Sequence, residues 1–256
     1  MIELQKNERA SLQSLCVGKS DVELFSCIEG KTGQVWANSK ENPTLAVILV
    51  ADFCFLLGHS EKLQDGDYIK KLYDNIRRKI IVPDSQFWID VIAKYFPNNH
   101  RKFSRYSIKT EPKVFNKAKL NSYVRAIESK FNIVNIDKTN YNKVLADDFM
   151  ADCCSNYSSL EDFTENGLGY LIIYEDEIIS AASSYGYCKG SIEITIGTKE
   201  EYRQKGLALA CASKLILNCL DRGIYPRWDA ANLESVALAE KLGYHFDKEY
   251  IVYSIF

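Results

Sequence analysis

The chain has 256 residues, which at roughly 150 residues per domain fits one large domain or two modest ones. Apolar residues make up 46% of it and charged residues 26%, so disordered, collagen-like and low-complexity classes are excluded. The formal net charge is −2, and no global field therefore draws the protein to nucleic acid or to an anionic membrane.

No segment is predicted to target or to cross a membrane. The longest apolar run, residues 45–57, falls short of the about 20 residues that span a bilayer. The N-terminal residues carry charged side chains, including Glu3 and Arg9, in place of the apolar core of a signal peptide. We therefore expect a cytoplasmic protein whose partners include neither a membrane nor a nucleic acid.

The eight cysteines form no CxxC pair, and no group of cysteine and histidine has metal-binding spacing. Several of them, such as Cys54 and Cys211, lie within apolar runs. Buried, reduced thiols and no metal are therefore expected. The alternative interpretation is that one of these cysteines is a catalytic nucleophile.

The N-terminal half is predicted to be a mixed α/β region. In chain order its expected elements are a helix over 2–16, strands over 34–38 and 44–57, and helices over 67–80 and 84–96. The strands are rich in β-branched and aromatic residues, and the segment 67–80 has its apolar residues at helical spacing. Asp84 is the expected N-cap of the last helix.

The two halves of the chain carry charge of opposite sign, net +5 over residues 1–120 and net −7 over residues 121–256. Much of the basic excess lies within residues 94–120, which also contain two prolines. Because proline breaks helices, this stretch is interpreted as the connection between an N-terminal α/β domain, residues 1–122, and a second domain, residues 123–256. A basic surface for nucleic acid is the alternative.

The C-terminal half is more regular. A short strand over 131–137 and a mostly helical stretch over 139–165 precede strands over 168–176, 177–187 and 191–198. Short turns between these three strands predict an antiparallel meander. The expected elements that follow are a helix over 205–222, a short strand over 226–229, an Asn-led helix over 232–243 and a last strand over 250–256.

The connection between the third meander strand and its helix has the sequence RQKGLA, residues 203–208. A helix N-terminus presents unpaired N–H groups and the positive end of the helix dipole, which suits an anion such as a diphosphate. Gly206 has no Cβ atom and so lets the backbone approach that anion closely, while Arg203 and Lys205 add positive charge. The spacing matches neither a P-loop nor the GxGxxG fingerprint.

This segment resembles motif A of the GNAT superfamily of N-acetyltransferases, whose pattern is Q/R-x-x-G-x-G/A after the fourth strand. Residues 225–244, YPRWDAANLESVALAEKLGY, resemble the superfamily's motif B, an Asn-led helix that ends in glycine and an aromatic residue. Residues 35–58 and 105–112 are further similar to the zwittermicin A resistance branch, which carries an extra N-terminal domain. The resemblance covers nearly the whole chain and is strongest over residues 191–244.

The resemblance implies an α/β (α+β) protein: a C-terminal GNAT fold with a mixed, mostly antiparallel central sheet flanked by helices, and a smaller α/β N-terminal domain. It also implies acetyl-CoA as co-substrate, its acetyl and pantetheine part bound by backbone groups of Ile196, Gly197 and Thr198. The diphosphate would be bound by the backbone amides of Arg203, Gln204, Lys205, Gly206, Leu207 and Ala208. Asn232 would bind the pantetheine arm, and Ser235 lies one helical turn later. A plain N-cap role is the alternative for Asn232.

The sequence departs from the family pattern at one position. Many GNAT enzymes place a tyrosine seven residues after the motif B asparagine, where it returns a proton to the departing CoA thiolate. This chain has Ala239 there. The general acid could instead be Ser235, Tyr244, Tyr185 or water. If none of them replaces the tyrosine, the enzyme is expected to be catalytically weak.

A base is also expected, because an amine with a pKa of about 10 needs roughly 4 kcal/mol to lose its proton at pH 7. A positioned carboxylate can accept that proton. Glu193 is the only carboxylate on its strand, and alternation places it on the face opposite Ile192 and Ile194, where an acceptor could bind. Plain solvent exposure of Glu193 is the alternative, and Asp229 is the second candidate base.

These residues together predict an acetyl-CoA-dependent N-acetyltransferase that passes the acetyl group directly to an amine of a small molecule, without a covalent enzyme intermediate. The branch resemblance implies an antibiotic-like amine. One alternative is a non-catalytic acyl-CoA-binding regulatory module of GNAT fold. Another is a nucleic-acid-associated acetyltransferase that uses the basic stretch 94–120. Whether the chain forms a homodimer stays open.

Overall fold

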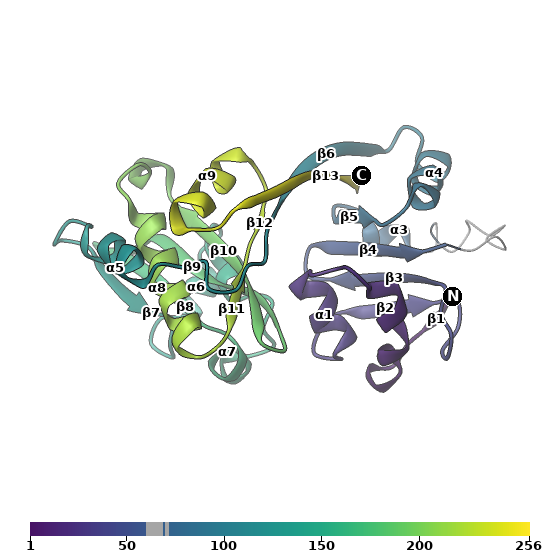
Figure 1. Cartoon of the computed structure of the whole chain (residues 1–256), viewed down its shortest axis with the longest axis horizontal. Helices are drawn as coiled ribbons and strands as arrows, with labels where there is room; N and C mark the ends of the chain where they lie inside the picture. The colour runs from purple at the N-terminus through teal and green to yellow at the C-terminus, as the bar shows by residue number, and fades with distance from the viewer. Residues whose placement is uncertain (60–68, 70–71) are drawn as a thin grey trace. The chain divides into compact units, whose positions relative to one another are not determined.

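A computed structural model describes residues 1–59, 69 and 72–256 of the chain. These residues form two compact units (Figure 1). Unit 1 comprises Met1–Arg105 together with Glu249–Phe256, and unit 2 comprises Tyr106–Lys248. The units divide after Arg105 and again after Lys248, whereas the sequence predicts a single boundary after residue 122.

Unit 1 is built on a mixed sheet. Its elements are β1 (Ile2–Glu3), the 3₁₀ helix η1 (Lys6–Cys16), α1 (Val22–Ile28), β2 (Gln34–Ala37), β3 (Leu45–Val50), β4 (Phe53–Gly58), α3 (Tyr73–Ile76), β5 (Ile80–Pro83), α4 (Gln86–Tyr95) and parts of β6 (His100–Ile108) and β13 (Phe246–Ile255). Strands β1 to β4 pair antiparallel in sequence order. Strand β5 pairs parallel with β4 and antiparallel with β13.

The expected single strand over residues 44–57 is a hairpin of two strands, β3 and β4. The turn between them contains Ala51, whose φ of 47° is uncommon for a residue other than glycine. Every residue of β3 is buried, and so are all but the last residue of β4. A strand buried on both faces shows no polar alternation, so no pattern in these residues marks where one strand ends and the next begins.

Two helix predictions in unit 1 need correction. Helix α4 begins after Ser85, and the Asp84 carboxylate accepts the Gly58 N–H at 2.8 Å instead of capping the helix. Most of the first half of the expected helix over 67–80 lies outside the described residues. Its described part contains the short α3, and Ile80 belongs to β5 rather than to a helix.

The basic stretch 94–120 is not a linker along its whole length. It contains β6 and the beginning of α5, with Pro97 and Pro112 outside the strand, where the missing N–H breaks no ladder bond. Polar side chains of the strand have partners, since the Ser107 hydroxyl donates to Asp247 at 2.9 Å. Regular pairing, rather than a solvated linker, therefore explains much of this segment.

Unit 2 contains the predicted meander. Its elements are α5 (Lys117–Arg125), β7 (Asn132–Asn135), α6 (Tyr141–Ala146), η2 (Ala151–Cys153), α7 (Leu160–Asn166), β8 (Gly169–Tyr174), β9 (Glu177–Cys188), β10 (Ser191–Thr198), η3 (Glu200–Tyr202), α8 (Leu207–Asp221), β11 (Tyr225–Arg227), β12 (Asp229–Ala230) and α9 (Leu233–Leu242). The five-stranded sheet has the order β11-β10-β9-β8-β7, with only the β10–β11 pair parallel.

None of the helices in the described part of the chain combines the length and the apolar character that a membrane crossing requires.

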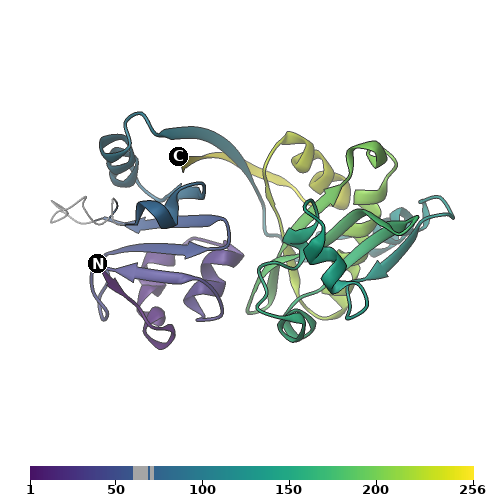
Figure 2. The same ribbon diagram turned by 180° about the vertical axis from the view of Figure 1, so that it is seen from behind.

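The sheet of unit 2 lies between two apolar layers. Tyr170 and Ile172 of β8 pack in the cluster that contains α8, whereas Leu171 packs in the cluster that contains α6 and α7. Figure 1 shows α8 against one face of the sheet, and the reverse view in Figure 2 shows the teal-green α6 and α7 on the other. The Leu/Ala-rich α8 buries side chains such as Leu215 completely, and burial of a leucine contributes about 1.5–3 kcal/mol.

The two units share one order of elements. In each, a strand, β1 or β7, is followed by helical segments, two in unit 1 and three in unit 2. An antiparallel three-strand meander, a helix, a strand parallel to the last meander strand and a further helix then follow. The two parallel pairs are β4–β5 and β10–β11. Unit 1 is thus a topological repeat of unit 2.

Candidate active site

The connection from β10 to α8 arranges backbone amides around an open space, at the position of the RQKGLA segment. Gln204 and Gly206 adopt positive φ angles of 61° and 78°. The Ala210 N–H donates to the Gly206 carbonyl at 3.0 Å, which is the first i→i−4 bond that a helix beginning at Leu207 can make. The amides of residues 207–209 precede that bond and have no acceptor within the helix, so this connection has the geometry of an anion-binding site.

Gly206 is required by its backbone conformation rather than by packing. Its φ of 78° lies in the region that residues with a side chain rarely adopt. A Cβ atom built there would have no other heavy atom within 4 Å. The space in front of the glycine is therefore available to a ligand.

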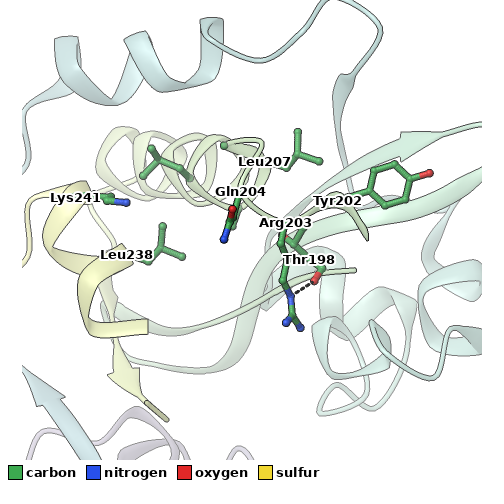
Figure 3. Close-up of a pocket in the computed structure, with 10 residues that line it drawn as sticks. Thr198, Tyr202, Arg203, Gln204, Leu207, Leu238 and Lys241 are labelled. Atoms are coloured by element: carbon green, nitrogen blue, oxygen red, sulfur yellow. Dashed lines mark hydrogen bonds between the residues drawn. The ribbon is translucent and has the colours of Figure 1, made fainter. Parts of the chain in front are cut away.

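A pocket of about 360 Å³ opens beside this connection (Figure 3). Its walls come from the end of β10, the first turn of α8 and the middle and end of α9. The lining residues are Thr198, Tyr202, Arg203, Gln204, Gly206, Leu207, Ala208, Leu209, Leu238 and Lys241. The structure therefore brings together most of the residues predicted for the diphosphate and places Thr198 beside them.

Two basic side chains of the motif take different positions. Arg203 lines the pocket, and its Nε donates to the Thr198 carbonyl at 3.3 Å, which ties the connection to the end of β10 (Figure 3). Lys205 is not part of the lining. Its Nζ donates to the Glu201 carbonyl at 3.1 Å and lies 4.9 Å from the centroid of the Tyr202 ring.

Strand β10 separates from its parallel neighbour part-way along its length. The β10–β11 pairing runs only from Ser191 to Glu193, after which β12 pairs with β6. Within the described residues, positions 194–198 of β10 pair with β9 alone. The backbone at Ile196, Gly197 and Thr198 thus has a strand on one side only, and the other side is an edge at which an extended ligand can hydrogen-bond.

The two predicted carboxylates, Glu193 and Asp229, meet where the strands separate. Glu193 Oε1 accepts the Asp229 N–H at 2.7 Å, and Glu193 is only 8% exposed. Solvent exposure of Glu193 was therefore the wrong alternative. Ile192 and Ile194 pack in the cluster with α8, as alternation predicts.

Asn232 and Ser235 meet at the first turn of α9. Asn232 Oδ1 accepts the Ser235 N–H at 2.8 Å, so Asn232 is the N-cap of the helix, and a ligand role stays a prediction. The side-chain NH₂ of Asn232 has no partner among the described residues. Ser235 Oγ accepts the Trp228 Nε1–H at 3.0 Å, which leaves its hydroxyl hydrogen able to donate elsewhere.

Position 239, where the resemblance to motif B implies a tyrosine, belongs to the core in this chain. Ala239 has no exposed surface and packs in the cluster that contains α8. Tyr244 does not replace the missing acid, because its hydroxyl donates to the Pro226 carbonyl at 2.8 Å and burial raises its pKa well above the ordinary value. Ser235 and the partly buried Tyr185 are the remaining side-chain candidates.

The predicted pantetheine-binding strand has an exposed aromatic neighbour. A Cβ atom at Gly197 would lie 3.1 Å from Phe149 Cε1 and 3.4 Å from Met150 Sδ, so glycine allows this close approach. Phe149 is 49% exposed, although it follows the apolar core of α6. The sequence offered no signal that this segment reaches β10.

Sequence reasoning also missed two residues of α9 that line the pocket, Leu238 and Lys241. They continue the three-residue spacing that begins at Asn232 and Ser235. Extending the helical period from the motif B asparagine would have found them, because residues three apart are neighbours on a helix surface.

The buried cysteines are structural. Seven of the eight are buried. Burial raises the pKa of Cys54 to about 12 and that of Cys211 to about 12, so these thiols stay protonated at neutral pH and are not nucleophiles. In the part of the chain that the structure describes, no three His, Cys, Asp or Glu side chains gather as a metal site.

The fold and this site together define the class of protein. The family model for GNAT acetyltransferase matches residues 13–253, and the chain therefore belongs to this family of acetyltransferases. The predicted fold class is confirmed: a mixed, mostly antiparallel sheet flanked by helices.

Particular relatives extend over nearly the whole chain. An uncharacterized N-acetyltransferase, YdfB, of Bacillus subtilis (strain 168) is 25% identical over 260 residues, which cover 98% of this chain and 97% of the relative. The crystal structure of a GCN5-related N-acetyltransferase-like protein from Streptococcus suis 89/1591 is 34% identical with a TM-score of 0.88, covering 98% of this chain and 99% of the other. A tandem GNAT protein from the clavulanic acid biosynthesis pathway shares the fold, with a TM-score of 0.60 at 11% identity and coverage of 99% and 97%.

Proposed function

We propose that this protein transfers an acetyl group from acetyl-CoA to an amine of a small molecule. The observation that carries the proposal is the β10–α8 connection, where amides with no helical acceptor, Arg203 and a pocket of about 360 Å³ occur together. An anion-binding helix N-terminus beside an unpaired strand edge suits a ligand with a diphosphate and an extended amide-containing arm. Acetyl-CoA has both.

In this proposal the backbone does most of the cofactor binding. The amides of residues 203–208 bind the diphosphate, and the edge of β10 at residues 196–198 bonds the pantetheine amides. The NH₂ group of Asn232 reaches the same arm from the start of α9. A backbone-lined site is consistent with glycine at positions 206 and 197, where a side chain would strain the backbone or meet Phe149.

The transfer is proposed to be direct, from thioester to amine. An amine with a pKa of about 10 must first lose a proton, at a cost of roughly 4 kcal/mol at pH 7. Glu193 is the proposed base, acting directly or through a water molecule, and Asp229 is the second candidate beside it. The Ser235 hydroxyl, which is able to donate, is the proposed acid for the departing thiolate.

A cationic acceptor is consistent with the charge of the chain. Residues 121–256 carry a net charge of −7, and a negative surface raises the local concentration of a cationic amine. The sequence resemblance to the zwittermicin A resistance branch suggests an antibiotic-like amine, and we extend the proposal to aminopolyol-type acceptors on that basis. The cytoplasm is the proposed compartment.

The experiment that tests the proposal measures two quantities on the same protein. Calorimetry gives the affinity for acetyl-CoA, and release of CoA thiol with a panel of amines gives turnover. Binding together with amine-dependent turnover is the expected result. Binding without turnover on any amine would favour a non-catalytic acyl-CoA-binding module, the alternative that Ala239 motivates, and the absence of binding would contradict the proposal itself.

A further inference from the structure

The pocket beside the β10–α8 connection has a cationic side chain on each of two opposite sides. Arg203 comes from the connection itself, and Lys241 comes from the last turn of α9. Figure 3 shows the two side chains on opposite sides of Gln204. The backbone amides of the connection and Arg203 can bind one anionic group, and Lys241 lies on the other side of the pocket.

Lys241 has no role in holding the protein together that would explain its place. Its side chain is exposed, and its Nζ forms no hydrogen bond or ion pair with any described residue. A lysine in the last turn of a helix interacts favourably with the helix dipole, but that contribution is only about 0.3–1 kcal/mol and does not require a pocket. A ligand with a second anionic group could pair with the Lys241 ammonium group.

The wall between the two cations is apolar. Leu207 and Leu209 come from the first turn of α8, and Leu238 lies one helical turn before Lys241. An apolar surface with a positive charge at each end suits a flat, weakly polar group that carries phosphate on both sides. The adenosine of CoA is such a group, with a diphosphate at its 5′ carbon and a separate phosphate at its 3′ carbon.

We infer that Lys241 binds the 3′-phosphate of the CoA adenosine, an inference that rests on the proposed function. The protein then selects acyl groups carried on CoA over the same groups carried on the phosphopantetheine of a carrier protein. Both donors offer the pantetheine arm to β10, but only CoA has a 3′-phosphate. Lys241 is thus a specificity-determining residue for the acyl donor.

The test compares two ligands and three proteins by calorimetry. The ligands are acetyl-CoA and 3′-dephospho-acetyl-CoA, and the proteins are the wild type, Lys241→Met and Lys214→Met. Lys214 is the matched control, an exposed lysine of α8 that lies 5.8 Å from the Tyr170 ring and outside the pocket lining. A charge-assisted hydrogen bond to phosphate predicts that Lys241→Met weakens acetyl-CoA binding roughly tenfold and leaves binding of the dephospho ligand unchanged. Lys214→Met should change neither.

Three results would decide against the inference. An equal loss for both ligands would place Lys241 on the diphosphate, and no loss for either would remove it from the site. A wild type that binds neither ligand would overturn the proposed function, and the inference with it. Because the comparison is between ligands on one variant, a small change in stability from the lost helix-dipole interaction does not affect it.

Discussion

Units 1 and 2 repeat one topology but differ at the place where unit 2 has its site. In unit 2 the last meander strand pairs with its parallel neighbour over three residues, Ser191–Glu193, and the rest of β10 keeps an open edge. In unit 1 the corresponding pairing covers four residues of β4, from Phe53 to Leu56, which is most of that shorter strand. The same order of strands and helices is therefore not sufficient to form the site.

The connections after these strands differ as well. Unit 2 has RQKGLA, with positive charge and a glycine at a positive φ. The connection after β4 in unit 1, residues 59–72, has the sequence HSEKLQDGDYIKKL, most of which lies outside the described residues. It lacks the motif A pattern, and its three acidic residues, Glu61, Asp65 and Asp67, balance its three lysines, so the segment carries no net positive charge that would favour a diphosphate. We therefore propose that acyl-CoA binds to unit 2 alone.

The largest expected effect comes from Gly206→Asp. A side chain and a negative charge in the open space before the amides should abolish acetyl-CoA binding, at least 100-fold by calorimetry, because about 3 kcal/mol of anion contact is lost. Gly190→Asp is the matched control, since Gly190 also has open space and a φ of 76° but lies in the β9–β10 turn outside the pocket. Equal affinities of the two variants would contradict the assignment of the site.

The next effect concerns the base. Glu193→Gln keeps an oxygen that can accept the Asp229 N–H, so the strands should stay in place, while kcat falls by about 10²–10⁴ at unchanged acetyl-CoA affinity. The loss should shrink as the pH rises toward the pKa of the acceptor amine, because the neutral amine needs no base. A normal kcat in Glu193→Gln, with a reduced one in Asp229→Asn, would transfer the role to Asp229.

A smaller effect is expected on stability. Ala239→Tyr introduces the residue that the resemblance to motif B implies at this position. The fully buried alanine leaves no space for a ring, so overpacking should cost about 1–3 kcal/mol in the free energy of unfolding. Urea denaturation measures this cost, and turnover should not rise. Ala237→Tyr, on the exposed side of the same helix, controls for the effect of tyrosine on α9 itself. An increase in kcat for Ala239→Tyr would mean that this position reaches the thioester after all.

Much of unit 2 could be predicted from sequence because its signals are local. The meander has polar turns, α8 has an apolar period and a following glycine, and Asn232 caps α9 as motif B indicates. Unit 1 was harder, since the buried β3 and β4 show no alternation and their turn contains Ala51 rather than glycine. The return of β13 to unit 1 is a long-range pairing, Tyr253 with Ile81, which no local pattern encodes.

The site was predicted where it depends on the backbone and missed where it depends on packing. Residues 203–208 stand out because a glycine together with basic residues at the start of a helix is typical of an anion-binding connection. The contact of Phe149 with Gly197 and the contribution of Leu238 and Lys241 require the fold. The hydrogen bond between Glu193 and Asp229 joins residues 36 positions apart. The sequence alone could therefore identify each carboxylate as a candidate base, but could not predict that the two residues are in contact.

The measurement that tests the central claim most directly is the stoichiometry of acetyl-CoA binding to the intact chain. Calorimetry with the wild type should give one acetyl-CoA per chain, because unit 2 has the amide-lined connection and the corresponding sequence of unit 1, residues 59–72, lacks the motif A pattern. Gly206→Asp should reduce that number to zero. Two sites per chain, or a single site that persists in Gly206→Asp, would contradict the assignment of acyl-CoA binding to unit 2 alone.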